Sequence, residues 1–316
     1  MKQAKTITKV VGVDVDKHRL HVAIYGSADA AVMHNTSAGI SELVAWMKAR
    51  EVGRVGMEAT GGYERNFKLA CDEAGFEVVV HQPIEVRRFA QFRRLKAKND
   101  KLDARLIAAA TAHVEAVKAA ADPRLADLAE RLTVYDQLSD HAAGLKTSLE
   151  HITIGAMKTL LRQQIQALEA AKKAVLKDVL ATIKSHADLA RRLVLLQSID
   201  GIGPAVAATL LVRMPELGSM TSSQAASLLG VAPFDHESGN YKGSRHIGKG
   251  RWRPRKMLYL AALSAKRCNP QLKALEQRLL KAGKAKKVAI VAVMRKLIEA
   301  ANLVLSRGSP WVRSPA

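Results

Sequence analysis

Residues 9–16, KVVGVDVD, and residues 20–25, LHVAIY, are two short apolar runs separated by a polar turn. β-Branched residues alternate in the first run, which is typical of a buried strand, and the second run is close enough along the chain to pair with it as a hairpin. Asp14 stands inside the first run, where an unpaired carboxylate is costly unless it lies at an edge or binds a cation. The chain therefore begins with a strand hairpin that carries a candidate functional acid.

The segments that follow extend this hairpin into an α/β pattern. Residues 31–36 are a candidate third strand, and 54–59 and 76–82 are further apolar strands. Helix-starting residues and helical spacing mark 37–50 and 61–75, and Pro83 begins a long helix that runs to about residue 120. The order β-β-β-α-β-α-β-α is that of a ribonuclease-H-like domain, so we predict an α/β fold for residues 1–120.

Acids fall on three elements of this predicted domain. Asp14 lies on the first strand and Glu58 at the end of the strand after the first helix. Asp100 and Asp103 are three residues apart, on one face of the last helix. If these elements meet at one edge, the carboxylates can hold one or two Mg²⁺ ions. The alternatives are a solvated helix face for the aspartate pair and a surface acid for Glu58, and Asp16 is a competing ligand.

The charge balance indicates a polyanionic partner. Lys and Arg number 50 against 29 Asp and Glu, a formal net charge of +21 in 316 residues. Nucleic acid is the leading candidate, and an anionic membrane surface is the rival, although no apolar run approaches the length of a spanning helix. Cys71 and Cys268 suggest neither a disulfide framework nor a zinc site, so a cytoplasmic setting fits best. Aromatic residues, at 4%, are too few for binding that relies mainly on base stacking.

Two basic clusters are candidates for contact with a phosphate backbone. The first surrounds the aspartate pair and comprises Arg87, Arg88, Arg93, Arg94, Lys96, Lys98 and Lys101. The second lies between Tyr241 and Lys256, where there are seven Lys and Arg and no acid. Its candidates are Lys242, Arg245, His246, Lys249, Arg251, Arg253 and Arg255.

The middle and end of the chain are predicted to be helical. Apolar residues from Leu125 to Ala156 step by threes and fours, which indicates a coiled-coil arm over 121–190 or, alternatively, an intramolecular helix pair. Residues 191–308 form a mostly helical C-terminal domain, followed by a tail, 309–316, that we expect to be disordered. Gly201 and Gly203 resemble the turn of a helix-hairpin-helix element, whose amides approach phosphate; a plain glycine-rich turn is the alternative.

The stretches GVDVDKHRLHVAIYG, GMEATGGYE and KNDKLDARLIA resemble the DEDD transposases and pilin-gene invertases, an insertion-sequence family whose studied members are bridge-RNA-guided recombinases. The resemblance covers nearly the whole chain. It implies an N-terminal RuvC-like domain whose metal-binding acids fall on Asp14, Glu58, Asp100 and Asp103. Asp16 departs from the family pattern, which often has a serine there.

The same resemblance assigns a nucleophile. In the family a serine lies in a Ser-Gly loop after a Gly-x-x-Pro segment, and GVAPFDHESG places Ser238 at that position. Without the resemblance Ser238 is a turn residue. Arg245 and His246 are candidates to assist the departing oxygen, with His246 favoured as a phosphate contact.

The resemblance implies a transposase that cuts and rejoins double-stranded donor and target DNA through a serine nucleophile, Mg²⁺ and a guide RNA. Its active site would combine the carboxylates of one subunit with the serine of another, in a dimer or tetramer on the nucleoid. One alternative is a structure-specific, Holliday-junction-type metal-dependent endonuclease, in which Ser238 is only a loop residue. The other is an architectural nucleic-acid-binding protein whose acids are solvated.

Overall fold

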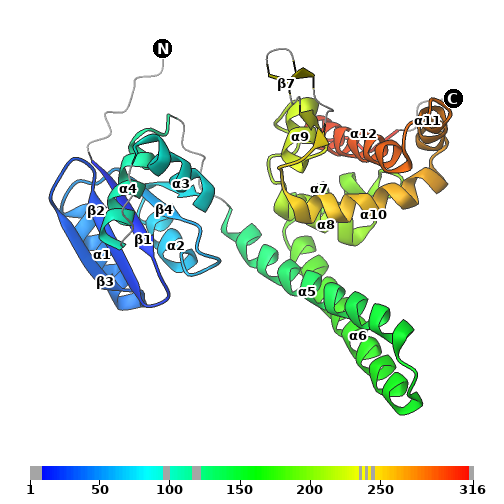
Figure 1. Ribbon diagram of the computed structural model, residues 1–316, viewed down its shortest axis with the longest axis horizontal. Coiled ribbons are helices and arrows are strands. Elements are labelled where there is room, and N and C mark those ends of the chain that lie inside the picture. The colour runs from blue at the N-terminus through cyan, green and yellow to red at the C-terminus, as the bar shows by residue number, and fades with distance from the viewer. Residues whose placement is uncertain are drawn as a thin grey trace. The chain divides into compact units, whose positions relative to one another are not determined.

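The computed structural model describes residues 9–94, 100–115, 122–234, 237–238, 241–242 and 246–312. The chain divides into two compact units, Met1–Ala121, blue to cyan in Figure 1, and Asp122–Ala316, green to red. The predicted division into 1–120, 121–190, 191–308 and 309–316 stays a prediction.

A five-stranded mixed sheet forms the centre of the first unit. Its strands are β1 (Val10–Val15), β2 (Arg19–Ile24), β3 (Ala30–His34), β4 (Arg54–Glu58) and β5 (Glu77–His81). The order across the sheet is β3-β2-β1-β4-β5. The first three strands pair antiparallel, whereas β4 is parallel to both β1 and β5. The central strands β1 and β4 are the most fully buried because both of their faces are covered. This is the arrangement expected of a ribonuclease-H-like sheet.

Helices cover the sheet as predicted, with one correction. Helix α1 (Ser37–Lys48) and helix α2 (Arg65–Glu73) follow the expected pattern. The single long helix expected from Pro83 is wrong, because the structure has α3 (Pro83–Phe92) and a separate α4 (Asp100–Ala112). Arg94, just after α3, has a φ of 55°, a left-handed conformation that an α-helix does not propagate.

Helix α4 lies directly on the two central strands. Gly12 of β1 and Gly56 of β4 are register partners. A Cβ atom on Gly12 would lie 2.1 Å from the backbone nitrogen of Ala108, and a Cβ atom on Gly56 would lie 1.7 Å from Thr111 Oγ1. Only glycine allows this approach, so the paired glycines fix where α4 crosses the sheet.

A helical hairpin begins the second unit. Helices α5 (Pro123–His151) and α6 (Gly155–Lys184) are joined by a short connection, and the ion pairs Lys146–Glu169 (2.7 Å) and Arg131–Asp178 (2.5 Å) show that they run antiparallel. The base of the hairpin joins the core of the unit. Apolar side chains near its tip are exposed, namely Ile154 (64%), Met157 (44%) and Leu160 (48%). An intermolecular coiled coil stays a prediction.

The rest of the second unit is a helical core. It contains α7 (Ala187–Gln197), α8 (Pro204–Arg213), α9 (Ser222–Leu229), α10 (Trp252–Cys268), α11 (Pro270–Lys281) and α12 (Lys286–Arg307). Helix α12 supplies the longest set of buried side chains and packs against α9, α10 and α11. No helix in the described ranges is long and apolar enough to cross a membrane.

The C-terminal tail is partly ordered, which corrects the expectation of disorder. Trp311 packs against the helical core, and its backbone N–H donates a hydrogen bond of 2.7 Å to Ser198 Oγ. The indole therefore anchors the chain beyond α12, while residues 313–316 lie outside the described part.

The hairpin supplies a prediction for acid stability. Hydrogen bonds from Lys146 and Lys172 lower the pKa of Glu169 from 4.5 to about 2. A carboxyl with a depressed folded-state pKa stabilises the fold above its unfolded value, and that contribution is lost as the pH falls through the folded value. The Tm of Glu169→Gln should therefore lie below that of the unmodified protein at neutral pH, and the difference should shrink between pH 4.5 and about 2.

Circular dichroism at 222 nm would measure this difference, because most of the described chain is helical. Glu150→Gln, a change of an exposed acid at the end of α5, is the matched control and should leave the Tm nearly unchanged. A Tm difference for Glu169→Gln that is constant across the acid range would contradict the assignment.

Candidate functional site

The direction of α4 places its acids at the edge where the central strands end. Arg54, the first residue of β4, donates hydrogen bonds to the backbone oxygens of Thr111 (3.5 Å) and Val114 (2.7 Å), at the C-terminal end of α4. The N-terminal end of α4, with Asp100 and Asp103, therefore points toward the carboxyl ends of β1 and β4.

Asp14 and Glu58 lie at that same edge. Asp14 comes two residues after Gly12 on β1, and Glu58 comes two residues after Gly56 on β4. Side chains two apart on a strand share a face, so both acids lie on the face that α4 covers. Asp14, Glu58 and Asp103 are each partly buried.

This donor set suits a hard divalent cation. Carboxylate oxygens are the ligands that Mg²⁺ prefers, and partial burial strengthens their hold on a cation. Within the described residues, no group of three or more His, Cys, Asp or Glu side chains is placed closely enough to hold a metal ion. The side chain of Asp100 lies outside the described part, so the four-carboxylate set stays a prediction.

Two loops that border this edge are linked by residues that sequence reasoning missed. Asn35 Nδ2 donates to the backbone oxygens of Asp16 (2.9 Å) and Tyr63 (3.2 Å), which joins the β1–β2 turn to the segment after β4. Within that segment, the Glu64 carboxylate accepts hydrogen bonds from Thr60 Oγ1 (2.8 Å) and from the backbone N–H groups of Thr60 (3.1 Å) and Gly62 (2.8 Å). Burial alone would raise the pKa of Glu64, but these hydrogen bonds lower it.

Asp16 is used to build the turn between β1 and β2. Its Oδ1 accepts hydrogen bonds from the backbone N–H groups of His18 (2.5 Å) and Arg19 (2.7 Å). The bond from His18 is the main reason that the pKa of Asp16 is lowered. This role explains an acid at position 16 without a metal.

A buried histidine contacts the C-terminal part of α4. His81 Nε2 lies 2.9 Å from Thr111 Oγ1, and that hydroxyl donates to the backbone oxygen of Ile107 (2.7 Å). Burial lowers the pKa of His81, which favours the neutral ring. His81 is also the register partner of Glu58, so the packing of α4 and the position of Glu58 depend on the same pair of strands.

Ser238 belongs to the second unit, in a segment of very short strands. It is the last residue of β7 (Glu237–Ser238), which pairs antiparallel with β8 (Tyr241–Lys242), opposite Tyr241. Strands β6 (Pro233–Phe234) and β9 (His246–Ile247) pair at the base of this segment. The serine therefore belongs to a short antiparallel strand pair in the segment between α9 and α10.

Comparison with known proteins decides the family. Residues 11–157 match the DEDD transposase model of the IS110 type, and residues 193–277 match the model described as Transposase IS116/IS110/IS902 family. The chain belongs to this transposase family. It is thus an enzyme that cuts and rejoins DNA, and its two matched regions fall largely into the two structural units.

Relatives of this transposase include the pilin gene-inverting proteins of Moraxella bovis and Moraxella lacunata. Each is 24% identical over 314 residues, which cover 95% of this chain and 97% of the relative. Two structures of Thermus thermophilus RuvC, one in complex with a Holliday junction substrate, are 14% and 15% identical. They cover 33% of this chain and 92% of RuvC, with TM-scores of 0.28 and 0.27.

The first basic cluster of the transposase is exposed where it is described. Arg87 and Arg88 lie on the exposed side of α3, and Arg93 and Arg94 follow its end. Lys96 and Lys98 lie outside the described residues, and Lys101 belongs to α4. Contact of these exposed arginines with a polyanion stays a prediction.

Three arginines of the second cluster contact the protein itself. Arg251 forms two hydrogen bonds to the Glu216 carboxylate, of 2.7 and 2.5 Å. Arg253 donates to Thr133 Oγ1 (2.8 Å) on α5, and Arg255 donates to the backbone oxygens of Lys249 (2.9 Å) and Gly230 (3.2 Å). These contacts hold the start of α10 in place. Phosphate binding by the three arginines stays a prediction, and a phosphate would have to replace these hydrogen bonds.

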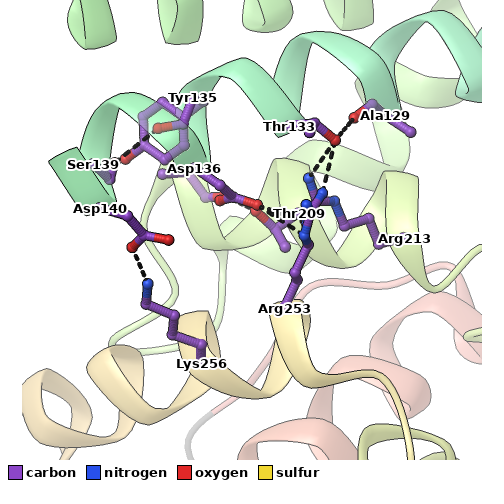
Figure 2. A network of polar contacts seen from close by, with 11 residues as sticks. Ala129, Thr133, Tyr135, Asp136, Ser139, Asp140, Thr209, Arg213, Arg253 and Lys256 are labelled. Atoms are coloured by element: carbon purple, nitrogen blue, oxygen red, sulfur yellow. Dashed lines mark hydrogen bonds and ion pairs between the residues drawn. The ribbon is translucent and has the colours of Figure 1, made fainter. Parts of the chain in front are cut away.

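Figure 2 shows how the start of α10 is tied to α5. Asp136 of α5 accepts a hydrogen bond of 2.7 Å from Arg213 of α8, and Arg253 Nε lies 3.8 Å from the same carboxylate. One turn further along α5, Asp140 pairs with Lys256. Burial lowers the pKa of Arg213, and the Asp136 charge opposes that effect. The sequence signal is the pair Asp136 and Asp140, four residues apart on one face of α5, which the apolar spacing of this helix does not mark.

The remaining candidates of the second cluster are only partly described. His246 and Lys249 are exposed, Lys242 belongs to β8, and Arg245 lies outside the described residues. Gly201 has a φ of 90°, and a Cβ atom there would lie 2.4 Å from Ala265 Cβ, so packing against α10 accounts for this glycine. Gly203 caps α8, and a Cβ atom there would meet nothing within 4 Å. The helix-hairpin-helix interpretation stays a prediction.

Proposed function

We propose that this transposase is a site-specific DNA recombinase in which Asp14, Glu58, Asp100 and Asp103 hold Mg²⁺ and Ser238 is the nucleophile. The observation that carries the proposal is the crossing of α4 at Gly12 and Gly56, which directs the N-terminal end of α4 to the strand edge bearing Asp14 and Glu58. The surrounding loops, linked through Asn35, give this edge a fixed border.

The carboxylates and the serine would have different tasks. Bound Mg²⁺ would neutralise charge on the scissile phosphate and lower the pKa of a coordinated hydroxyl. The acids would orient the phosphate, and exposed Arg87 and Arg88 would guide the DNA backbone toward them.

Ser238 would exchange one phosphate ester for another. As the Ser238 Oγ–phosphorus bond forms, the bond from phosphorus to the departing deoxyribose oxygen breaks, and the serine proton is transferred so that this oxygen leaves as a hydroxyl. Arg245 and His246 are the proposed residues beside the departing oxygen. Because the phosphoserine conserves an ester bond, a new DNA hydroxyl can reverse the step without an external energy source.

Assembly is part of the proposal. The carboxylates belong to one structural unit and Ser238 to the other, so an oligomer can combine them from different subunits. The exposed apolar tip of the α5–α6 hairpin, with Ile154, Met157 and Leu160, supports an oligomerising arm. Donor and target DNA, a guide RNA and a cytoplasmic, nucleoid-associated location complete the proposal. The names of the Moraxella relatives suggest inversion of a DNA segment as one outcome.

A covalent-capture assay tests the nucleophile. Purified protein with its co-purifying RNA is incubated with Mg²⁺ and labelled DNA from the flanks of its own gene, and the products are separated on a denaturing gel. We expect a protein–DNA adduct that is absent with Ser238→Ala and retained with Ser219→Ala, a change of an exposed serine elsewhere in the same unit.

The products also separate the two enzyme classes. Free cleaved DNA that persists with Ser238→Ala but disappears with Asp103→Asn would assign the protein to the metal-dependent endonucleases. An adduct that survives in Ser238→Ala would instead place the nucleophile on another residue.

A further inference from the structure

Helix α10 presents two aromatic side chains to solvent. Trp252, its first residue, is 54% exposed, and Tyr259 is 37% exposed. They are seven residues apart, or two helical turns, so both rings lie on one face of the helix. The chain has only three tryptophans and five tyrosines, so two exposed aromatic side chains on one helix stand out.

The position of Trp252 is fixed by its neighbours. Arg251 before it forms hydrogen bonds to Glu216 and to the backbone oxygen of Arg213 (2.7 Å). Arg253 after it donates to Thr133, and its guanidinium carbon lies 5.3 Å from the centre of the Trp252 ring. Both flanking residues are thus held against the protein, while the indole between them remains exposed. An exposed aromatic ring on a segment that is already held in place suits ligand binding because less of the chain has to be ordered on contact.

The charge of α10 favours a polyanion. Its sequence, WRPRKMLYLAALSAKRC, contains five Lys and Arg and no acid. Three of these cations, Arg253, Lys256 and Lys266, have acidic partners or neighbours on other elements, whereas Arg267 lies on the exposed surface. An exposed aromatic pair on a basic helix matches the chemistry of unpaired nucleotides, whose bases stack on rings while the backbone follows positive charge.

We propose that the face of α10 formed by Trp252 and Tyr259 binds unpaired nucleotides by stacking their bases. Trp252 follows the segment that carries Ser238 by fourteen positions and is joined to it through β9, so a base stacked there lies on the same structural unit as the serine. The inference rests on the DNA-handling activity of the family and does not require Ser238 to be the nucleophile.

Fluorescence of Trp252 tests the contact directly. In the double variant Trp46→Phe/Trp311→Phe, Trp252 is the sole tryptophan. The full-length variant is titrated in EDTA with oligothymidylate, with oligouridylate and with a blunt duplex that has no unpaired base. We expect quenching by single strands and little quenching by the duplex. Comparison of the two single strands distinguishes DNA from RNA as the source of the nucleotides. Equal quenching by duplex and single strands would overturn the proposal.

Affinity measurements with the natural tryptophans in place give an independent test. Trp252→Ala should weaken single-strand binding by about 5- to 150-fold, the range for loss of one base–aromatic stack, and leave duplex affinity unchanged. Trp252→Tyr should restore most of the affinity. The matched control is Leu260→Ala, which removes an apolar side chain with the same 54% exposure from the same helix and should have no effect.

Two outcomes would refute the assignment. One is unchanged single-strand affinity in Trp252→Ala. The other is a change of oligomeric state in Trp252→Ala, by light scattering, without a change in single-strand affinity, which would assign this face to contact with a second copy of the chain. Because no step requires cleavage or metal, failure here is distinguishable from failure of the proposed recombination.

Discussion

Asp14→Asn is expected to lower the rate of DNA strand cleavage by about 10²- to 10³-fold, the usual cost of removing one preorganised electrostatic contact from an active site. The substitution keeps the shape of the side chain and removes its charge. Asp14 lies on the face of β1 that α4 covers, so the change should weaken the proposed binding of a divalent cation without disturbing the packing at Gly12. Cleavage of labelled DNA and titration calorimetry with Mn²⁺ would measure both effects.

The matched control is Asp29→Asn, the same change at an exposed acid of the same unit. It should cleave DNA and bind Mn²⁺ like the unmodified protein. Asp103→Asn should behave like Asp14→Asn, because Asp103 lies near the end of α4 directed to the same edge. Unimpaired cleavage by Asp14→Asn at saturating DNA would show that cleavage does not take place at the sheet edge that carries Asp14.

Gly12→Ala is expected to have the largest effect on stability. The new Cβ atom would lie 2.1 Å from the Ala108 nitrogen and 2.3 Å from the Ala104 oxygen, both backbone atoms of α4. Because no rotamer change can relieve a clash with backbone, α4 must move, and we expect a loss of more than about 2 kcal/mol of unfolding free energy. Displacement of α4 also moves Asp103, so cleavage should fall as well.

Gly144→Ala is the matched substitution. Gly144 lies within α5, and a Cβ atom there meets nothing within 4 Å. Alanine at an exposed helix interior should raise stability by about 0.5–1 kcal/mol. Urea unfolding followed by circular dichroism would measure both variants. A Gly12→Ala protein as stable as the Gly144→Ala protein would show that α4 does not press on β1 as described.

Local patterns in the sequence predicted most of the first unit. The alternation in residues 9–16 and the apolar runs at 54–59 and 76–82 correspond to β1, β4 and β5 because buried strands need continuous apolar side chains. The break between α3 and α4 was missed because it depends on the backbone conformation of Arg94, which residue type does not reveal.

The contacts of the second unit were less accessible from sequence because they are non-local. The sequence predicts that Arg251 and Arg253 contact a nucleic-acid backbone. In the structure their partners are Glu216 and Thr133, which are 35 and 120 residues away along the chain. Asn35 likewise links two loops through backbone oxygens, and nothing in its neighbourhood marks it. A basic side chain can bind a ligand only if it is not already bonded to an acid or a carbonyl group elsewhere in the protein. Only the tertiary structure shows which side chains are bonded in this way.

The internal contacts of Arg251, Arg253 and Arg255 also affect the thermodynamics of DNA binding. Each cation that neutralises a phosphate releases condensed counterions and adds about 0.9 to the slope of log affinity against log salt. A cation adds to this slope only when it reaches a phosphate, and these three arginines are held by Glu216, by Thr133 and by the backbone oxygen of Lys249. The segment from Tyr241 to Lys256, despite its seven basic residues, therefore contributes less ionic-strength dependence than its composition suggests. The arginines that hold α10 in place should therefore add little to the rise in duplex affinity that accompanies a fall in salt concentration.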